Sequence, residues 1–342
     1  MRNRLWVSPM CQYSAIDGMP QEWHHVHLAQ FASGGAGLVV AEATAISPEG
    51  RISPDDVGLW NDAQRDAWTP IAAAIRRRGA VAGIQLAHAG RKASTWAPFA
   101  AQRGTVSAQD GGWRTVAPSA IAFGALAAPQ ALDADGIDRV VADFAAAARR
   151  ARASGFQVIE LHGAHGYLLH QFLSPLSNQR DDEYGGSLQN RARLLLRVID
   201  AVREAAPEAP LFVRLSASDW AEGGWDLEQT TAVAAWASSH GADFFDISSG
   251  GLVAHQQIAL RPGYQVPFAA AVRRAAGVAV STVGLIDDAR HAEQIVADGQ
   301  ADAVMAAREW LRDPHFALRA SIELGDEIDY WPPQYLRARP RR

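Results

Sequence analysis

The amino-acid sequence predicts a (β/α)8 barrel, because eight short apolar runs rich in β-branched residues alternate with eight helical stretches. Neither a linker nor a low-complexity segment divides the 342 residues, so we expect one domain over residues 1–342. Two doubly wound domains are the alternative architecture, but they would require a boundary within the chain. The barrel therefore accounts best for the order of the elements.

These patterns place each element in turn. The expected strands lie at residues 5–10, 37–43, 81–87, 157–162, 210–216, 243–248, 278–283 and 302–307. The expected helices lie at residues 23–33, 63–78, 137–154, 188–206, 228–240, 266–275, 288–298 and 308–323. Ser187, Asp226 and Asp287 stand where helices should begin. Glycines stand where four helices should end: Gly79, Gly155, Gly241 and Gly299.

One long segment, residues 89–135, separates the third strand from its helix. It contains the stretches GRKASTWAPF and GGWRTVAPSAIAF. Loops of this length are uncommon in compact domains and usually form lids or binding elements. We therefore expect the insertion 89–135 to act as an active-site lid.

Composition narrows the classes of function. The chain is 48% hydrophobic and 20% charged with a net charge of −5, as in soluble globular proteins. No apolar run reaches the ~18 residues of a membrane span, and no signal-peptide pattern opens the chain. The only basic cluster is the terminal RARPRR, so we expect no membrane or nucleic-acid partner and a cytoplasmic location. A single cysteine, Cys11, excludes an internal disulfide framework and a four-cysteine iron–sulfur cluster within the chain.

In such a barrel the chemistry lies at the carboxyl ends of the strands. Polar or otherwise unusual residues stand at those ends in nearly every expected strand. They are Ser8, Pro9, Met10, Cys11, Tyr13, Glu42, Ala43, Thr44, Gln85, His88, His162, His165, Tyr167, Arg214, Ser248, Ser249, Gly284, Ala307 and Arg308. Any one of them could be an ordinary loop residue, but their convergence on one rim indicates an active site.

Two parts of this rim suit flavin mononucleotide (FMN). The loops after the last two strands commonly bind phosphate in this fold, where Gly284 would let the backbone approach closely and Arg308 would donate hydrogen bonds. Gln85 and Arg214, near the barrel centre, suit a flat heterocycle with carbonyl and imide edges. The chain has no GxGxxG fingerprint, so we do not expect a Rossmann domain to hold the cofactor.

The stretch IELHGAHGYLLHQF, at the end of the fourth strand, places His162, His165 and His170 close together. Such a cluster could be a metal site, a proton relay, a grip on an anionic substrate or ordinary packing. Gly163 and Gly166 interrupt any helix, and no acidic third ligand follows at a suitable spacing, so we expect no metal.

With these residues placed, the chain resembles the Old Yellow Enzyme family of FMN-dependent ene-reductases, in particular its thermophilic-like branch. The matching segments include SPMCQYS, EATAISPEGRI, IQLAHAGRKAS, IELHGAHGYLLHQFLSPLSNQRDDEYGGSLQNR, DISSGG and AREWLRDP. The resemblance covers essentially the whole chain. It implies reduction of activated alkenes, such as α,β-unsaturated carbonyl or nitro compounds, with NADPH or NADH as the hydride donor.

The resemblance also implies a role for each matching residue. For FMN it implies Ser8, Pro9, Met10, Cys11, Ala43, Gln85, Arg214, Gly284, Ala307 and Arg308, with Cys11 also tuning the redox potential. For the substrate it implies a pocket with Tyr13. His162 and His165 would hold the carbonyl or nitro oxygen, because Gly163 and Gly166 turn the chain toward it, and His170 would be structural. The hydride would pass from FMN to the β-carbon, and Tyr167 would protonate the α-carbon.

Three other functions can be weighed against this one. A non-catalytic flavin-binding redox sensor would need no proton donor, so Tyr167 beside the histidines favours an enzyme. Related barrel dehydrogenases carry a cysteine cluster and further domains, which one cysteine and 342 residues argue against. A metal-dependent barrel hydrolase would need the third ligand that the histidine cluster lacks.

The chain departs from the family pattern at two places. Ala307 replaces the usual glycine before Arg308; its backbone N–H remains, so we expect a weaker or shifted phosphate contact rather than its loss. Met1 begins almost inside the first strand, where family members carry a further segment, so we expect lower stability than in a form extended upstream.

The tail PPQYLRARP resembles the one with which this branch sends an arginine into the neighbouring subunit's active site. The matching residue is Arg337. The resemblance therefore implies a homodimer or homotetramer in which Arg337 helps to bind the substrate.

Overall fold

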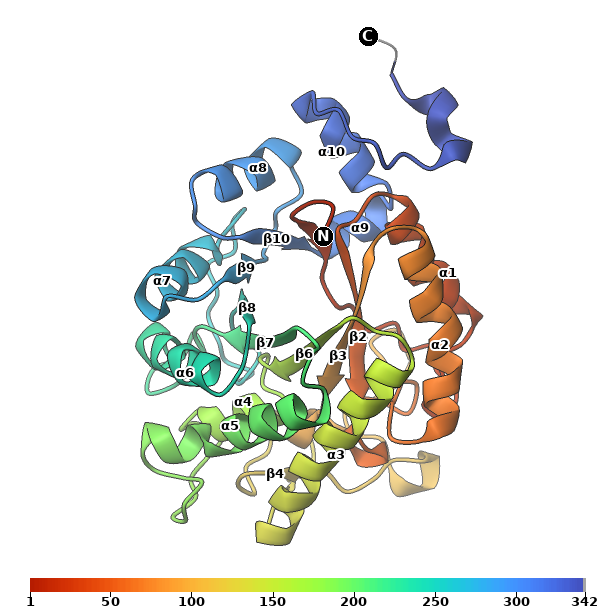
Figure 1. Cartoon of the computed structure of the whole chain (residues 1–342). Coiled ribbons are helices and arrows are strands. Elements are labelled where there is room, and N and C mark those ends of the chain that lie inside the picture. The colour runs from red at the N-terminus through yellow and green to blue at the C-terminus, as the bar shows by residue number, and fades with distance from the viewer. Residues whose placement is uncertain (341–342) are drawn as a thin grey trace.

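The computed structural model describes residues 1–340; residues 341 and 342, which end the expected domain and the basic cluster, lie outside the described residues. Eight parallel strands close into a barrel (Figure 1). They are β1 (Leu5–Val7), β2 (Leu38–Ala45), β3 (Val81–Ala87), β6 (Val158–Gly163), β7 (Leu211–Ser216), β8 (Phe244–Ser248), β9 (Val280–Thr282) and β10 (Ala303–Ala306). Because β1 pairs with both β2 and β10, the barrel has no free edge. The (β/α)8 fold and the eight predicted strands are confirmed, although β1 and β9 are shorter than expected.

Helices surround the barrel. They are α1 (Glu22–Ser33), α2 (Asp62–Arg77), α3 (Ala134–Ala153), α4 (Leu168–Leu173), α5 (Leu188–Ala205), α6 (Leu227–Ser239), α7 (Val266–Ala276), α8 (Ala289–Ala297), α9 (Arg308–Arg312) and α10 (Phe316–Leu324). The six residues of α4 are too few for a helical period to be recognised in the sequence. The prediction of one helix over 308–323 was wrong, because Pro314 forces the preceding Asp313 into an extended conformation that ends α9. None of the helices in residues 1–340 is both long and apolar enough to cross a membrane.

The predicted helix ends are largely confirmed. The side chains of Ser187 and Asp226 accept hydrogen bonds from the third residues of α5 and α6. At α8 the expected start was one residue early, since Asp288, not Asp287, accepts the N–H of His291 at 2.8 Å. The expected glycines follow their helices with positive φ: Gly79, Gly155, Gly241 and Gly299.

The long segment between β3 and α3 lies at the mouth of the barrel, where the strands end. It contains the short 3-10 helices η2 (Gly90–Lys92) and η3 (Ala108–Asp110) and a small parallel sheet of β4 (Val116–Ala117) and β5 (Gln130–Ala131). Arg91 Nη2 donates to the carbonyl of Leu252 at 2.8 Å, which ties this segment to the loop after β8. That place suits a lid, and the lid role stays a prediction.

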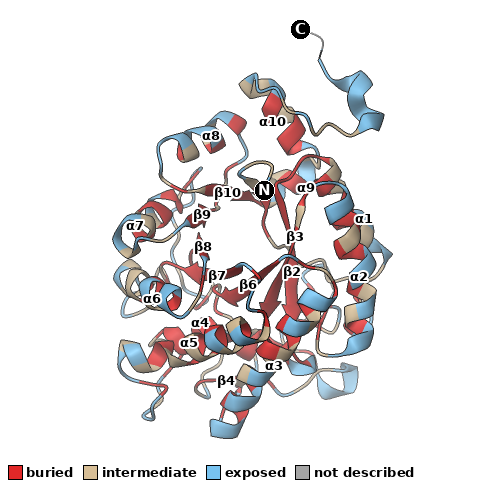
Figure 2. Ribbon diagram, in the orientation of Figure 1, coloured by how far each residue is buried: buried red, intermediate tan, exposed pale blue. Residues whose placement is uncertain are grey.

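The base of the barrel, where the strands begin, is closed by stacked aromatic rings. The ring centroid of Trp6 lies 5.2 Å from that of Phe244 and 6.0 Å from that of Phe212, and the two phenyl rings are 4.6 Å apart. These rings are buried with Leu38 and Val40 in an apolar cluster inside the barrel. Figure 2 shows the buried strands at the centre and exposed residues on the outer faces of the helices.

Candidate active site

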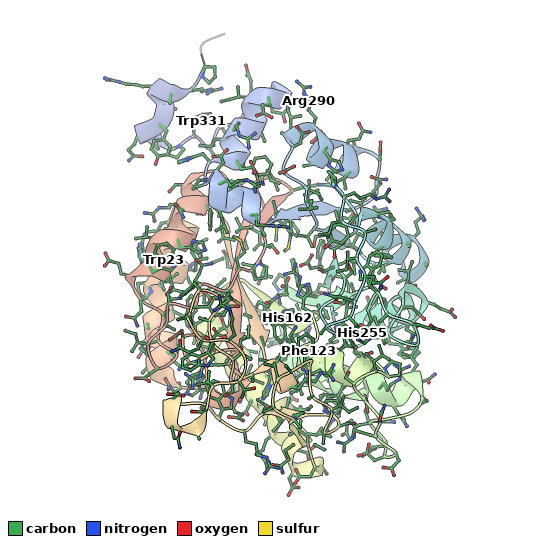
Figure 3. All side chains as sticks on the ribbon, turned by 180° about the vertical axis from the view of Figure 1, so that it is seen from behind. Trp23, Phe123, His162, His255, Arg290 and Trp331 are labelled. Carbon is green, nitrogen blue, oxygen red and sulfur yellow. The ribbon has the colours of Figure 1, made fainter. Side chains whose placement is uncertain are left out.

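Three predicted catalytic side chains come together where β6 ends. The imidazole centroids of His162 and His165 are 5.1 Å apart, and the centroid of the Tyr167 ring lies 5.0 Å from that of His162. His162 is buried near the middle of the barrel (Figure 3). Its Nδ1 atom has no hydrogen-bond partner among residues 1–340. Because buried polar atoms nearly always have partners, this nitrogen indicates a place for a ligand.

The backbone of His165 is strained and is held by three contacts. Its φ is 57°, in the left-handed region that residues other than glycine rarely adopt. Its N–H donates to Ser216 Oγ at 3.0 Å, and its carbonyl accepts a hydrogen bond from Lys92 Nζ at 2.9 Å. Its Nε2 lies 2.7 Å from Ser248 Oγ. The neighbouring strands and the insertion therefore fix this histidine in place.

The turn that carries His165 begins after Gly163, not at it as expected. Gly166 has a φ of 72°, as a turn residue should. The expectation for Gly163 was wrong, because this glycine still belongs to β6 and pairs with Leu215 of β7. A Cβ at Gly163 would lie only 2.9 Å from the carbonyl oxygen of Arg214, so the strand needs glycine for close packing rather than for a turn.

Burial keeps the donors of this site neutral. Burial lowers the pKa of His162 and of His165 well below the ordinary value, and the nearby Arg214 lowers both further. A neutral imidazole still has one N–H to donate. Burial also raises the pKa of the Tyr167 phenol well above its usual range, so this side chain keeps its proton. The group can thus offer neutral N–H and O–H donors from one buried side chain, His162, and two half-buried ones, His165 and Tyr167.

Lys92, which the sequence reasoning missed, ties these pieces together. Its Nζ donates to the carbonyls of His165 and Gly251, both at 2.9 Å, and lies 4.9 Å from the centroid of the Tyr167 ring. Burial and then the charge of Arg91 lower its pKa to about 8. The sequence did contain a signal, because Lys92 is the only lysine among the 32 basic residues.

A second polar network spans side chains of β3, β6, β7, β8 and β9. Gln85 Nε2 donates to Glu160 Oε1 at 2.7 Å, and Arg214 Nε lies 2.8 Å from Asp246 Oδ2. Asp246 Oδ1 in turn accepts a hydrogen bond from Ser281 Oγ at 3.0 Å. Burial and then the charge of Asp246 raise the pKa of Glu160 to about 8. The two carboxyl groups were missed, although an acidic residue inside a buried apolar strand is itself a signal.

A cavity of about 200 Å³ opens beside Arg214 at the ends of β9 and β10. Gly284, Ala307 and Arg308 line it, as expected for a phosphate site. Gly284 has a φ of 128°, and a Cβ there would lie 2.9 Å from Gln265 Nε2, so only glycine fits. Ala307 keeps its backbone N–H and immediately precedes α9.

The residues around this cavity fit FMN. Arg214, which is paired with Asp246 through its Nε atom, and Arg308 both line this cavity. Two guanidinium groups facing one cavity suit a phosphate and the electron-rich edge of a flavin. The remaining residues that the resemblance implies for FMN lie on the same rim: Ser8, Pro9, Met10, Cys11, Ala43 and Gln85.

The loop after β1 adds a thiol and a second phenol to the site. Cys11 lies close enough to Tyr13 to influence the ionisation of that phenol. Burial raises the pKa of the Cys11 thiol well above its ordinary value, and the carboxyl groups of Asp56 and Glu42 raise it further. Burial likewise raises the pKa of Tyr13. Glu42 supports this loop, since its Oε2 accepts the N–H of Gln12 at 2.9 Å. Cys11 is therefore a thiol and not a thiolate at neutral pH.

His170 lies beside the group but faces away from it. Its Nδ1 accepts the N–H of Gly166 at 2.9 Å, and its Nε2 lies 3.0 Å from Asp219 Oδ1. Both ring nitrogens are thus occupied by the protein, as expected for a structural histidine. Within residues 1–340, no group of three or more His, Cys, Asp or Glu side chains is placed to hold a metal ion.

Arg337 lies apart from the other predicted residues. It is an exposed residue of the 3-10 helix η4 (Pro333–Ala338), in the tail that leaves the barrel beyond α10 (Figure 1). The tail does not bring it to the site of its own chain. Its role in a neighbouring subunit stays a prediction.

Comparison with known proteins agrees with this geometry. The sequence model of the NADH:flavin oxidoreductase / NADH oxidase family matches residues 1–327. The NADPH dehydrogenase of Listeria welshimeri is 46% identical over 341 residues, which cover 99% of this chain and 95% of the relative. The NADPH dehydrogenase of Bacillus subtilis is 44% identical over 340 residues, with 98% and 95% covered.

Two solved structures are similar over almost the whole barrel. Morphinone reductase has a TM-score of 0.78 and 29% identity, covering 97% of this chain and 88% of its own. The Old Yellow Enzyme homologue from Zymomonas mobilis has a TM-score of 0.78 and 28% identity, covering 99% and 96%. These matches confirm the resemblance that the motifs carried and the expectation of a flavoenzyme. The chain belongs to the NADH:flavin oxidoreductase / NADH oxidase family and is an oxidoreductase that uses FMN.

Proposed function

We propose that this oxidoreductase is an NADPH-dependent ene-reductase that reduces the C=C bond of α,β-unsaturated carbonyl or nitro compounds. The observation that carries the proposal is the group of neutral donors at the end of β6, where the ring centroids of His165 and Tyr167 lie 5.1 Å and 5.0 Å from that of His162. The proposal is supported by the relatives named NADPH dehydrogenase.

The two histidines are the groups that would bind the substrate oxygen. His162 has a buried nitrogen without a partner, and His165 would exchange its contact with Ser248 for the substrate. Negative charge develops on that oxygen during reduction, and fixed N–H donors in a site without water stabilise it strongly. FMN, when bound, supplies the hydride chemistry.

Tyr167 would supply the proton. Its raised pKa makes it a weak acid, but an enolate-like carbon is basic enough to accept a proton from a phenol that is held in place. Tyr13 would line the substrate pocket beside it, and Cys11 would lie against the flavin as a neutral thiol. The remaining rim residues would hold FMN as the resemblance implies.

Anaerobic spectroscopy tests this function directly. The purified protein should be yellow, NADPH should bleach its visible absorbance, and 2-cyclohexenone added afterwards should restore it with formation of cyclohexanone. Bleaching by NADPH without reoxidation by the enone would contradict the ene-reductase proposal while leaving the flavoenzyme intact.

We also propose a homodimer or homotetramer in which Arg337 reaches the neighbouring active site. This is supported by its position on an exposed tail that leaves its own barrel. Within each chain, residues 1–342 would form one domain with the insertion 89–135 as a lid, supported by the tie between Arg91 and the loop after β8. Measurement of the molecular mass in solution tests the oligomer, and a monomer would contradict it.

A further inference from the structure

A small cavity lies behind Tyr167, between β2, β3 and the loop that follows β2. Its volume is about 10 Å³, and alanines and glycine form most of its wall. The polar side chains that line it are those of Asp56, Arg51 and Tyr167. A cavity of this size is just large enough for one water molecule, and these three side chains can supply the two or more polar partners that a buried water needs. The cavity therefore offers a route for a proton between Asp56 and Tyr167.

Asp56 is a buried carboxyl group that the proposed chemistry has not used. Its Oδ2 accepts the N–H groups of Ile52 at 2.7 Å and of Ser53 at 3.2 Å, and its Oδ1 accepts the Ser53 hydroxyl at 2.9 Å. Only 1% of its surface is exposed. Despite these hydrogen bonds, burial and then the charge of Glu42 raise its pKa to about 7. Near neutral pH this group can both release and take up a proton.

Tyr167 needs a source of protons after each turnover. Once it has protonated the substrate it is a phenolate, which burial disfavours. Two neighbours, Cys11 and Tyr13, are poor donors because burial raises the pKa of each. Lys92 is nearer in acidity, but its ammonium lies over the face of the Tyr167 ring and two of its three hydrogens are bound to carbonyls. Asp56 has the lower pKa of the two and lines the cavity that reaches Tyr167.

We propose that Asp56 is the relay residue that returns a proton to Tyr167 through a water molecule in this cavity. The inference rests on the proposed function of Tyr167. The Asp56 carboxyl gives its proton to the water, the water gives one of its own to the Tyr167 phenolate, and the resulting carboxylate regains a proton from solvent. Arg51, which lines the same cavity and is partly exposed, marks the side that faces solvent. The charge balances because one proton enters for each proton delivered to the substrate.

The charged and titratable groups facing Asp56 decide how the relay depends on pH. Glu42 raises its pKa from β2, while Arg51 carries a positive charge in the same loop. Cys11 and Tyr13 stay neutral on the other side. A carboxyl group with a raised pKa is protonated below that value and ionised above it. Steady-state turnover should therefore fall as the pH rises through about 7.

The test compares the rate of a single turnover with the steady-state rate in the FMN-loaded enzyme. In Asp56→Asn the amide oxygen can still accept the two N–H groups, so the loop is retained, but no proton can be released. Reoxidation of the reduced enzyme by 2-cyclohexenone in a single turnover should keep its rate, because Tyr167 starts protonated. Steady-state kcat should fall by about 10- to 100-fold, and its pH dependence near 7 should disappear.

Ser53→Ala is the matched control, since it removes a hydrogen bond to Asp56 without removing the carboxyl group. It should retain steady-state turnover and a pH dependence, with the fall moved to higher pH because the hydrogen bond that is lost lowers the pKa of Asp56 in the wild-type enzyme. The relay is wrong if Asp56→Asn turns over at the wild-type rate, or if the pH dependence persists in Asp56→Asn and disappears in Lys92→Gln. If 2-cyclohexenone did not reoxidise the reduced wild-type enzyme even in a single turnover, the proposed function itself would be contradicted.

A measurement on the wild-type enzyme keeps the relay testable if Asp56→Asn does not fold. Above pH 7 the first turnover should remain fast and later ones should slow, which gives a burst whose amplitude equals the FMN concentration. Below pH 6 the burst should vanish because Asp56 is protonated. A burst that does not change with pH would overturn the proposal.

Discussion

The mouth and the base of this barrel are built from the same strands and differ in almost every physical respect. At the base, Trp6, Phe212 and Phe244 stack in an apolar cluster that needs no polar partner. At the mouth, the same sheet presents neutral imidazoles, with a strained His165 and a buried nitrogen of His162 without a partner. The closed base stabilises the fold, so that the mouth can hold groups that weaken it.

This division has a consequence for mutations. A change at the base should act on the free energy of unfolding and leave the chemistry alone. A change at the mouth should act on the chemistry and leave the free energy of unfolding almost unchanged. Four substitutions, taken from the largest expected effect to the smallest, can break or sharpen that contrast.

The phenol of Tyr167 should matter most for the chemistry. Replacing it with Phe removes the proposed proton donor and should slow alkene reduction by about 10²- to 10⁴-fold, while flavin reduction by NADPH keeps its rate. Stopped-flow absorbance of the two half-reactions measures this. Tyr184→Phe is the matched control, because Tyr184 is buried but contacts Arg197 away from the mouth. A Tyr167→Phe enzyme that reduces enones at full rate would refute its role.

Trp6 should matter most for stability. Trp6→Ala leaves a hole among stacked rings at the base and should lower the free energy of unfolding by about 3–5 kcal/mol. Trp6→Phe, which retains an aromatic ring, should cost clearly less. Urea unfolding measures both, and the visible spectrum of bound FMN should stay the same. A changed FMN spectrum with an unchanged free energy of unfolding would show that a change at the base acts on the mouth instead of on stability.

Lys92 lies at the mouth, but it holds the backbone of His165 in place rather than touching the substrate, so its effect should be intermediate. Lys92→Met leaves the carbonyls of His165 and Gly251 without their donor and should lower kcat/KM by about 10- to 100-fold. This corresponds to a loss of about 1–3 kcal/mol of transition-state stabilisation, the size expected when buried acceptors lose their donor. Lys92→Arg should restore part of this loss. Because it is the only lysine, side-chain ¹⁵N signals of lysine-labelled protein report on it alone and should titrate near pH 8. An ordinary lysine pKa would contradict the buried position.

Arg337 should have the smallest effect, because it belongs to neither region of its own chain. Arg337→Ala should raise the KM for the enone by about threefold to tenfold, equivalent to about 1 kcal/mol for an exposed charge, without releasing FMN. Arg339→Ala, in the same exposed tail, is the control and should change nothing. Equal kinetics in the two variants would remove the proposed role across subunits.

Several expectations failed where neighbours in space overrule the local pattern. Gly163 looks like a turn residue in sequence, yet it continues β6 because its lack of a Cβ allows close packing against the carbonyl of Arg214. The helix expected over 308–323 failed for a local reason instead, because Pro314 divides it although the apolar pattern continues across the break. Lys92 was overlooked because its partners are backbone carbonyls, and a sequence does not show where a carbonyl points.

The sequence by itself determined the alternation of strands and helices, the barrel, and the set of side chains at the strand ends. These follow from local periodicity, helix-end residues and motifs, all of which are properties of neighbouring residues. The tertiary structure decided which of those side chains share a contact and which are buried. Asp56 and Glu160 are ordinary acids in the sequence, and only burial beside a second carboxyl group raises the pKa of each to near or above neutrality. Burial depends on residues far along the chain, so the chemistry of these groups can be known only once the barrel has closed around them.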